Sequence, residues 1–462
     1  DGEVDLTADA ELDDPTLLLR AAEAAALLDT PFRRGVLEQL GAEAALPAAP
    51  WPFEARNALV GLLGAGPGLV PVADALDDRG LMNRLLPEWG SVQYRPQRNA
   101  LHRYTVDRHL LEATVQASRL TRRVERPDLL LVGAWLHDLG KGAPGDHTEA
   151  GVALMGQIGP RLGFPEADVE TLATLVREHL LLPSIATSRD LDDPLTAEAV
   201  AERVGTVTTL ELLEALTEAD SLATGDGVWN AFKAALVASL VARVRDVLAG
   251  EVTQPSAGGP PEEHVALARR AAGSLLVEGH DGRVVVAAPD RPGLLARVVG
   301  LLTIHAQSVR SAVVSTVGDT AVEEFRVVPL FGRDADWTNF AAELDDAIAD
   351  RFPLEARIAE RTRDYGGVGP RASQPVEARV LVHRDASTTD TVLEVRASDG
   401  VGVLYRLTQT LASEGLDVRQ ARANTLGHEV VDTFYLRDRT GGKLDDAAIT
   451  RVERALLASL RP

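Results

Sequence analysis

Histidines and aspartates that could hold a metal ion are concentrated in one part of the chain. Five of the ten histidines lie between His102 and His179, and His137 is followed directly by Asp138 in the word Leu-His-Asp-Leu-Gly-Lys-Gly. The apolar run from Leu129 to Trp135 precedes this pair, so at helical spacing His137 falls on a core face. A polar pair in such a place predicts a buried site.

Asp220 and His179 also follow apolar stripes at helical spacing. A buried carboxylate needs a counter-charge. Each of these residues taken alone is typical of a hydrogen-bonded core residue, but the set indicates a metal site. The chain has no cysteine, so the available ligands are histidines and carboxylates, which suit Mg²⁺ or Mn²⁺ first, and also Fe or Zn²⁺.

The chemistry expected of such a centre is hydrolysis of a phosphate ester. A divalent cation can lower the pKa of a bound water and polarise a phosphoryl oxygen. Lys141 stands just beyond the predicted ligands, where its charge could neutralise the phosphate of a substrate.

These residues resemble the HD phosphohydrolase superfamily. His109, the pair His137-Asp138 and the distal Asp220 fit its H…HD…D pattern over about 130 residues. The resemblance implies that these four residues bind one metal, with Asp138 and Lys141 in catalytic roles. It also implies that His147 and His179 complete a second metal site. His102 is a weaker candidate, with a role behind the ligands or in the fold as the alternative.

A narrower resemblance rests on three local words. They are His102-Arg-Tyr-Thr-Val-Asp-Arg-His109, Asp146-His147-Thr148-Glu149, and Ala219-Asp220-Ser221 followed by Thr224-Gly225. They look like the HD region of the bifunctional uridylyltransferase/uridylyl-removing enzymes, which modify the nitrogen-regulatory PII protein. This resemblance implies a phosphodiesterase that removes a uridylyl group, or in some relatives an adenylyl group, from PII.

An internal repeat follows at a constant offset of about 109 positions. Asp290 aligns with Asp399, Gly293 with Gly402, and Phe325 with Phe434. Each copy reads strand, turn, helix, strand, turn, strand, which predicts a small α+β sandwich of about 70 residues. The two copies resemble ACT domains of ferredoxin-like fold, and a tandem pair of them implies glutamine as the effector.

The effector is expected at the turn before the helix of each copy. The candidate residues are Asp290, Gly293 and Leu294 in the first copy, and Asp399, Gly402 and Val403 in the second. Backbone N–H groups at a helix N-terminus can receive a carboxylate, and either aspartate could pair with an ammonium group. The alternative is a simple turn with proline and glycine at their favoured positions. The second copy departs from the first, with Asp-Gly-Val-Gly in place of Asp-Arg-Pro-Gly.

The length of 462 residues predicts about three domains, and the pattern of the chain places them. We expect a multidomain protein with an all-α first part and two α+β domains. The regions are a helical connector (1–95), an HD domain (96–250), a linker and helix (251–278), the first ACT domain (279–352), an inter-repeat segment (353–387) and the second ACT domain (388–462).

The charge and hydropathy of the chain limit the classes of binding partner that we expect. A formal charge of -22 works against sequence-independent binding to nucleic acid, and no run of about 18 apolar residues could span a bilayer. We therefore expect a cytoplasmic protein with a protein partner and small ligands, and with no membrane or nucleic-acid partner.

Two alternatives stay open at this point. A guanosine-polyphosphate hydrolase of the alarmone type also combines HD and ACT domains, and a non-catalytic HD/ACT sensor would need only the binding sites. A nucleotidyltransferase would have a Gly-Ser turn followed by an Asp-x-Asp arrangement, and we find none before His102. The carboxylate pairs Asp13-Asp14 and Asp77-Asp78 do not follow a strand and a Gly-Ser turn. The resemblance therefore implies the C-terminal part of such an enzyme, with the transferase domain upstream and outside this chain.

Overall fold

A computed structural model describes residues 2–97, 102–189, 191, 193–225, 228–250, 260–330, 332, 335–365, 377–384, 386–426 and 429–461. The chain divides into two compact units. The helical unit comprises Asp1–Ala186 and Ala197–Thr253, and the sheet unit comprises Thr187–Thr196 and Gln254–Pro462. Residues 251–259 of the predicted linker lie outside the described residues, and so do residues 366–376 of the inter-repeat segment.

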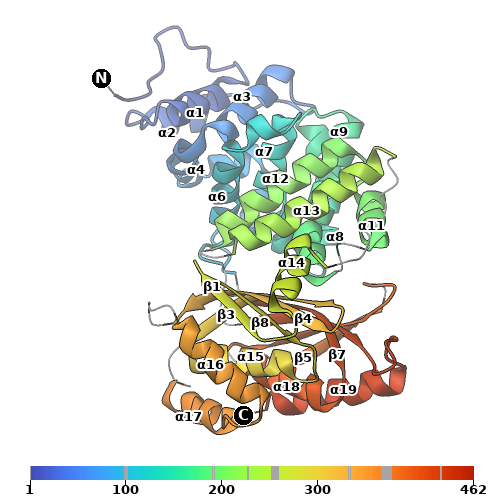
Figure 1. The fold of residues 1–462 in the computed structure, drawn as a ribbon. Coiled ribbons are helices and arrows are strands. Elements are labelled where there is room, and N and C mark those ends of the chain that lie inside the picture. Colours follow the sequence, from blue (N-terminus) through green and yellow to red (C-terminus); the bar gives the residue numbers. More distant parts are fainter. Residues whose placement is uncertain are drawn as a thin grey trace. The chain divides into compact units, whose positions relative to one another are not determined.

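The elements of the helical unit are α-helices joined by short turns (Figure 1). They are α1 (Leu17–Leu27), α2 (Val36–Glu43), α3 (Phe53–Gly64), α4 (Leu69–Asp77), α5 (Leu81–Leu85), α6 (Val106–Ser118), α7 (Pro127–Leu136), α8 (His147–Arg161), α9 (Glu166–Glu178), α10 (Leu181–Ser188), α11 (Pro194–Val204), α12 (Val207–Thr224) and α13 (Ala231–Leu248).

Capping residues and apolar faces explain where the later helices of this unit form. Asp146 begins α8 by accepting hydrogen bonds from two backbone N–H groups of the first turn, and Thr206 caps α12 in the same way. Every residue of α7 from Leu129 to Leu136 is buried, so this helix forms the centre of the unit and α6, α9 and α12 pack around it. The prediction of helices in both N-terminal regions is confirmed.

The sheet unit contains two four-stranded antiparallel sheets with six helices among its described residues. The elements are α14 (Glu262–Ala271), β1 (Leu276–His280), β2 (Arg283–Pro289), α15 (Leu294–Ile304), β3 (Gln307–Val317), β4 (Thr320–Pro329), α16 (Trp337–Ile348), α17 (Leu354–Tyr365), β5 (Arg379–His383), β6 (Thr391–Ser398), α18 (Val403–Ser413), β7 (Asp417–Leu426), β8 (Glu429–Arg437) and α19 (Asp446–Ser459).

The repeat seen in the sequence is a repeat of structure, down to its irregularities. The strand orders are β1-β2-β4-β3 and β5-β6-β8-β7. Gly293 and Gly402 both adopt a left-handed backbone before α15 and α18, and the strand register slips after Val309 in β3 and after Val418 in β7. Two α+β copies are therefore confirmed. Each copy also has an edge strand, β1 or β5, that the sequence pattern did not predict.

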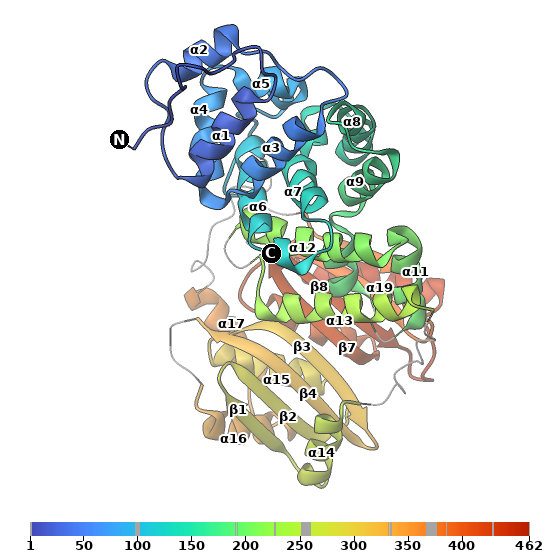
Figure 2. The ribbon, with the colours of Figure 1, turned by 90° about the horizontal axis from the view of Figure 1, so that it is seen from above.

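The two sheets meet along β3 and β7, which lie side by side (Figure 2). The helices α15, α16, α18 and α19 cover one face of these sheets, and α14 packs on the opposite face of β2 and β4 (Figure 1). The helix predicted within the region 251–278 ends at Ala271, because Ala272 and Gly273 both take positive φ. A single hydrophobic core runs through both copies.

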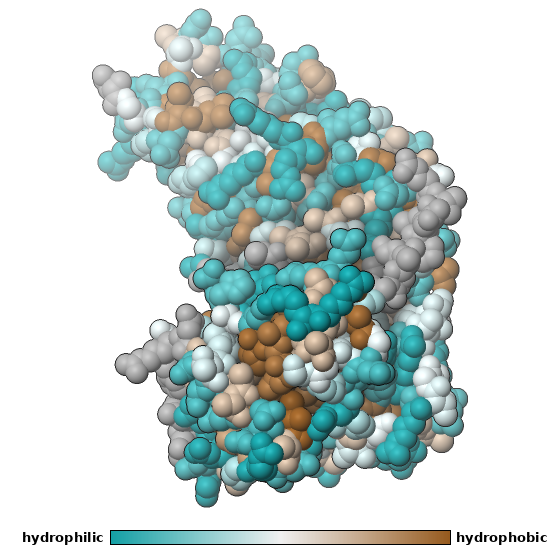
Figure 3. Space-filling model, in the orientation of Figure 1, coloured by the Kyte–Doolittle hydropathy of each residue, from teal (hydrophilic) through white to brown (hydrophobic). Residues whose placement is uncertain are grey.

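No single helix among the described residues is long and apolar enough to cross a membrane, although the bent pair Phe53–Gly64 and Gly66–Asp77 passes such a test by length and composition. The side chains of Leu59, Leu62 and Leu76 in that pair are buried in the helical unit. The visible surface is mixed, with a hydrophobic area on the sheet unit set among hydrophilic side chains (Figure 3).

A carboxylate is buried in the core of each sheet. Glu323 in β4 and Asp432 in β8 stand 109 positions apart and are 1% and 2% exposed. Glu323 Oε2 has no hydrogen-bond partner among the described residues. Burial, reinforced by the negative charge of Asp290, raises the pKa of Glu323 to about 8. Glu323 is therefore mostly protonated at neutral pH.

We predict that this group makes the sheet unit less stable as the pH rises from 5 to 8. When folding raises the pKa of a group, its stabilising contribution is complete at pH values below the pKa of the unfolded state. That contribution is lost as the pH rises to the pKa of the folded state. A shift of one pKa unit corresponds to about 1.4 kcal/mol, so the loss is at most on the order of 4 kcal/mol. The neighbouring Glu324 does not contribute in this window, because its hydrogen bonds to Arg283 and His264 lower its pKa to about 2.

Urea unfolding at pH 5 and pH 8 tests this prediction with Glu323→Gln, which mimics the protonated side chain. The variant should match the parent at pH 5 and exceed it in unfolding free energy at pH 8. The exposed Glu360→Gln serves as the control. Equal pH slopes in the parent and Glu323→Gln would show that Glu323 is ionised in the folded protein.

Candidate metal centre

Four helices that pack against one another bring the predicted ligands together. His109 lies in α6 and Asp220 in α12, while His137 and Asp138 directly follow α7. His179 directly follows α9. The helices α7 and α12 contact each other, and both contact α6 and α9, so residues up to 111 positions apart in the sequence share one buried region.

The central group is His109, His137 and Asp138, which offer ligand atoms within 4.8 Å of one another. These three side chains are at most 3% exposed. Asp220 Oδ1 lies 3.0 Å from His109 Nε2 and 3.5 Å from His137 Nε2. His179 Nε2 lies 3.7 Å from Asp138 Oδ1. The arrangement suits a small cation held by nitrogen and oxygen.

Two of the histidines are oriented by the ends of the helices that precede them. His137 Nδ1 is 2.9 Å from the carbonyl oxygen of Ala134, and His179 Nδ1 is 2.8 Å from that of Val176. A carbonyl oxygen can only accept, so each Nδ1 carries a proton, and a ring in its neutral form then has its lone pair on Nε2. Metal-binding histidines are held in this way.

Several buried atoms of the group lack the partner that burial requires. His109 Nε2, His137 Nε2 and Asp138 Oδ1 have no hydrogen bond among the described residues. The contact of His109 Nε2 with Asp220 is close, but it lacks hydrogen-bond geometry. Unpaired buried polar atoms are costly, and a cation bound between these atoms would satisfy all three. The residues present therefore fit a divalent metal ion.

The electrostatics of the group also favour a cation. Burial alone would raise the pKa of Asp220, but its interactions with His109 and His137 hold that pKa well below the usual value. Burial would likewise raise the pKa of Asp138, which His137 and Lys141 keep low. Without a cation, the pKa of His137 is raised because the charges of Asp138 and Asp220 outweigh the effect of burial. In the absence of a metal, a proton on His137 supplies the positive charge that a bound cation would otherwise supply.

The turn after Asp138 requires its glycine. The segment Leu139–Gly142 forms a 3₁₀ helix, and a Cβ atom at Gly140 would lie 1.9 Å from the carbonyl oxygen of His147. The start of α8 can therefore approach the centre closely only because residue 140 is glycine. The same turn carries Lys141, whose Nζ donates to Asp138 Oδ2 at 2.5 Å and to Gln97 Oε1 at 2.9 Å.

Two of the predicted histidines stand apart from the central group. His147 is exposed at the first position of α8, so the second metal site that includes it remains a prediction. The ring of His102 meets that of His109 edge-on at 5.4 Å between centroids. Burial and the charge of Lys141 lower the pKa of His102 to about 4, so this residue is neutral at physiological pH.

The predicted effector residues lie at corresponding turns of the two copies. Gly293 and Gly402 precede α15 and α18, and the side chains of Leu294 and Val403 are buried in the core. Only the backbone of those two residues faces the turn, and both N–H groups already donate within it, to Arg291 and Gly400. Asp399 sits at the corresponding turn of the second copy.

The neighbours of Asp290 come from both copies, and the sequence pattern did not single them out as site residues. Asp290 interacts with Thr316, Asp417 and Arg419, and Arg419 Nη1 donates to Thr316 Oγ1 at 3.1 Å. Burial and the charge of Asp417 raise the pKa of Asp290. The repeat could have pointed to Arg419, because it aligns with Arg310 in the Val-Arg word of each copy.

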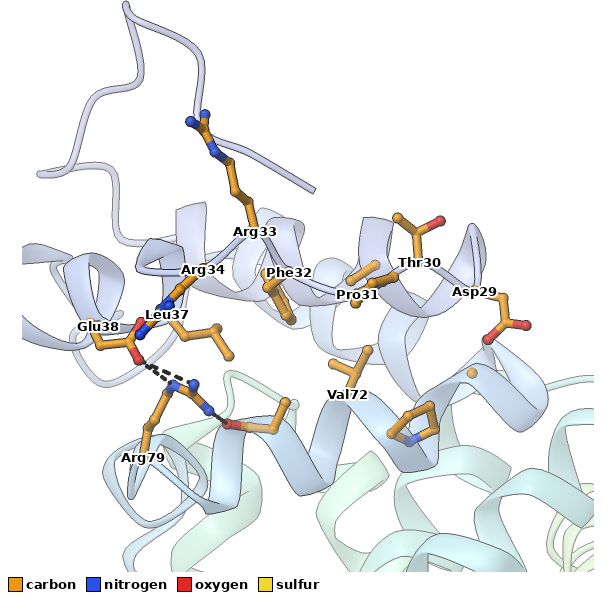
Figure 4. A pocket seen from close by; sticks show the side chains of 14 residues that line it. Asp29, Thr30, Pro31, Phe32, Arg33, Arg34, Leu37, Glu38, Val72 and Arg79 are labelled. Atoms are coloured by element: carbon orange, nitrogen blue, oxygen red, sulfur yellow. Dashed lines mark hydrogen bonds and ion pairs between the residues drawn. The ribbon is translucent and has the colours of Figure 1, made fainter. Parts of the chain in front are cut away.

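A pocket of about 300 Å³ lies elsewhere in the helical unit, between α1, α2 and α4. Its lining includes Phe32, Val72 and Arg79, and it contains none of the predicted ligands (Figure 4). Arg79 already binds Glu38 and the carbonyl oxygen of Ala75. This pocket is therefore separate from the metal centre.

Comparison with known proteins supports both domain predictions. Residues 106–225 match the HD domain family, and residues 282–336 match the ACT domain family. The HD match encloses His109, His137, Asp138, His179 and Asp220, and it places this domain among the HD-superfamily hydrolases.

Relatives extend the match to almost the whole chain. The chain is 42% identical over 97% of its length to the bifunctional uridylyltransferase/uridylyl-removing enzyme of Streptomyces coelicolor, of which it covers 59%. It is 40% identical over 94% of its length to the enzyme of the same name from Mycobacterium tuberculosis, of which it covers 55%. Over almost its whole length, the chain is therefore similar to a region that covers somewhat more than half of these bifunctional uridylyltransferase/uridylyl-removing enzymes.

Proposed function

We propose that the helical unit is a metal-dependent phosphodiesterase that removes the uridylyl or adenylyl group from modified PII protein, and that glutamine bound to the sheet unit stimulates it. The observation that carries the proposal is the buried group of His109, His137 and Asp138, with its unpaired nitrogen and oxygen atoms. The names of the relatives support the choice of the uridylyl-removing reaction.

His109, His137, Asp138 and Asp220 would hold the cation, with Mg²⁺ or Mn²⁺ first and Fe or Zn²⁺ as alternatives. The chemistry that such a cation supplies is Lewis acidity toward water and toward the phosphoryl group. Asp138 is ionised and fixed by Lys141, so it offers one oxygen to the centre while the other is held. His179 would join a second site with His147, beside the first.

Lys141 adds a positive charge at the edge of this centre. Its two hydrogen bonds, to Asp138 and Gln97, fix the ammonium group although a quarter of the side chain is exposed. A fixed ammonium group next to the metal ligands stabilises the negative charge that a phosphoryl group gains during hydrolysis.

For glutamine, we propose the turn at Asp290 as the binding position. Asp290 would pair with the ammonium group of the ligand, and Arg419 from the second copy would pair with its carboxylate. The side chains of Asp290 and Arg419 both interact with Thr316. A ligand that contacts both copies senses their relative position, which gives it different affinities for different states.

A short segment offers the route from the sheet unit to the metal ligands. Residues Thr187–Thr196 belong to the sheet unit, yet they lie within the HD match, from the end of α10 to the start of α11. Asp193 Oδ2 accepts a hydrogen bond from the backbone N–H of Thr388 at 2.9 Å, and the carbonyl oxygen of Arg189 accepts one from Arg422 at 2.8 Å. We call this segment the strap.

Along the chain, a single helix separates the strap from the candidate metal ligand His179. His179 is followed by α10, which ends where the strap begins. A shift of the second ACT domain would therefore pull on the helix that starts two residues after His179. This covalent path supports coupling between glutamine and hydrolysis.

The metal assignment predicts the outcome of Asp138→Asn, which keeps the shape of the side chain and removes its charge. Mn²⁺ affinity should fall at least about 10-fold and nucleotide release at least about 100-fold, since even groups behind a metal ligand contribute on this scale. Isothermal titration with Mn²⁺ and chromatography of released UMP or AMP measure the two effects. Asp78→Asn, on an exposed helix end, should change neither. Normal Mn²⁺ binding by Asp138→Asn would remove Asp138 from the ligand set.

The substrate assignment is tested with PII carrying UMP or AMP, in the presence of Mn²⁺, with and without glutamine. Release of one nucleotide that rises with glutamine is the expected result. Turnover of guanosine polyphosphate, with no release from either form of PII, would instead support an alarmone hydrolase.

The strap predicts that Asp193→Ala uncouples the two units. Basal nucleotide release should stay within about twofold, while stimulation by glutamine should largely disappear. Asp336→Ala is the matched control, because Asp336 caps α16 of the sheet unit with the same type of side-chain hydrogen bond but does not touch the strap. Full stimulation in Asp193→Ala would exclude the strap as the route.

A further inference from the structure

Lysine is rare in this chain, and its positions are informative. The sequence has 47 basic residues, of which only Lys141, Lys233 and Lys443 are lysines. Arginine presents a planar fork of donors, whereas lysine presents a compact point charge. Two of the three lysines are linked to carboxylates of the metal centre. Lys141 binds Asp138, and Lys233 lies in the first turn of α13, which packs against the helix α12 that carries Asp220.

Lys233 is held in place at the start of α13. Its backbone N–H donates to the side chain of Asn230 at 2.9 Å, which caps the helix. Its Nζ donates to the carbonyl oxygen of Val228 at 3.3 Å. The first bond fixes the backbone at Lys233, and the second fixes the end of its side chain.

The ammonium group of Lys233 keeps unused donors. An ammonium group has three N–H bonds, and Val228 accepts one of them. Within the ranges that the structure describes, no carboxylate lies at ion-pair distance from it, Asp220 included. The surroundings bury the group enough to lower its pKa, while the charge of Asp220 acts to raise it. A partly buried cation with free donors is suited to bind an anion.

Lys141 differs in this respect, because its ammonium group already contacts Asp138 and Gln97. A purely structural partner of Asp220 would be expected to form an ion pair with it, as Lys141 does with Asp138. Lys233 forms none, although the charge of Asp220 acts to raise its pKa.

We propose that Lys233 is a further catalytic residue, which binds a phosphoryl oxygen of the substrate on the Asp220 side of the centre. Lys141 supplies the charge on the Asp138 side. This inference rests on the proposed hydrolysis of a phosphodiester, and it concerns the phosphoryl group alone, so it holds for any nucleotide that the enzyme removes.

The test uses Lys233→Met, which keeps most of the volume and removes the charge. The substrate is bis(4-nitrophenyl) phosphate with Mn²⁺ and without glutamine, and inorganic phosphate is the competitive inhibitor. We expect kcat/KM to fall about 100-fold and the inhibition constant of phosphate to rise at least tenfold. The Kd for Mn²⁺ should stay within twofold, which a collapsed centre would not permit. Lys443→Met, in the sheet unit, should leave all three values unchanged.

Three outcomes would overturn the inference. They are an unchanged kcat/KM and phosphate inhibition in Lys233→Met, a loss of Mn²⁺ affinity equal to the loss of rate, and a parent protein that neither hydrolyses this diester nor binds phosphate. Failure of the PII assignment is a separate result. It would appear as hydrolysis of the synthetic diester without release of nucleotide from modified PII.

Discussion

The structure of the helical unit depends on one constraint, the burial of two carboxylates and three imidazoles without enough protein partners. Asp138 and the rings of His109 and His137 are almost fully enclosed, and three of their polar atoms have no hydrogen bond among the described residues. Such a group is costly in an empty site and favourable around a cation. The packing of α6, α9 and α12 around the apolar α7 makes sense as the support that keeps this group in place.

The C-terminal ends of two helices orient the imidazole rings of His137 and His179. His137 and His179 both stand at the first position after a helix, where the carbonyl oxygen three positions earlier is still free to accept a hydrogen bond. Each ring therefore uses one nitrogen to hold its orientation and keeps the other for a ligand. This relation also explains why the histidines follow apolar stripes, because the stripe packs the helix that positions them.

Sequence patterns could predict that His137, His179 and Asp220 are buried in the helical unit, since a polar residue on a core face is visible from spacing alone, whereas His109 was indicated by the family resemblance. They could also predict the two copies of the sheet fold, because the repeat needs no gap and α15 and α18 begin and end 109 positions apart. The edge strands β1 and β5 escaped prediction because they are spaced 103 positions apart and fall outside the repeat. Lys233 escaped because its relation to Asp220 depends on how α13 packs against α12, and the strap escaped because its contacts join distant segments. The pairs Asp193–Thr388 and Arg189–Arg422 are about 200 positions apart and leave no periodic signal.

The two copies differ at the turn before the helix and in their contacts with the strap. In the proposed function, these differences would give the two copies different tasks. The first copy keeps Asp-Arg-Pro-Gly at its turn, where Asp290 faces Thr316 and Arg419. The second copy has a different turn, but it holds the strap through the backbone of Thr388 and the side chain of Arg422. Arg419 and Arg422 lie on the same strand, β7, one toward the proposed effector and the other toward the strap. In the proposed regulation, a ligand at Arg419 would act on a strand that also carries Arg422, so β7 would link the two contacts. Under this proposal, a tandem pair would separate effector binding from its transmission, because the two would use different copies of the fold.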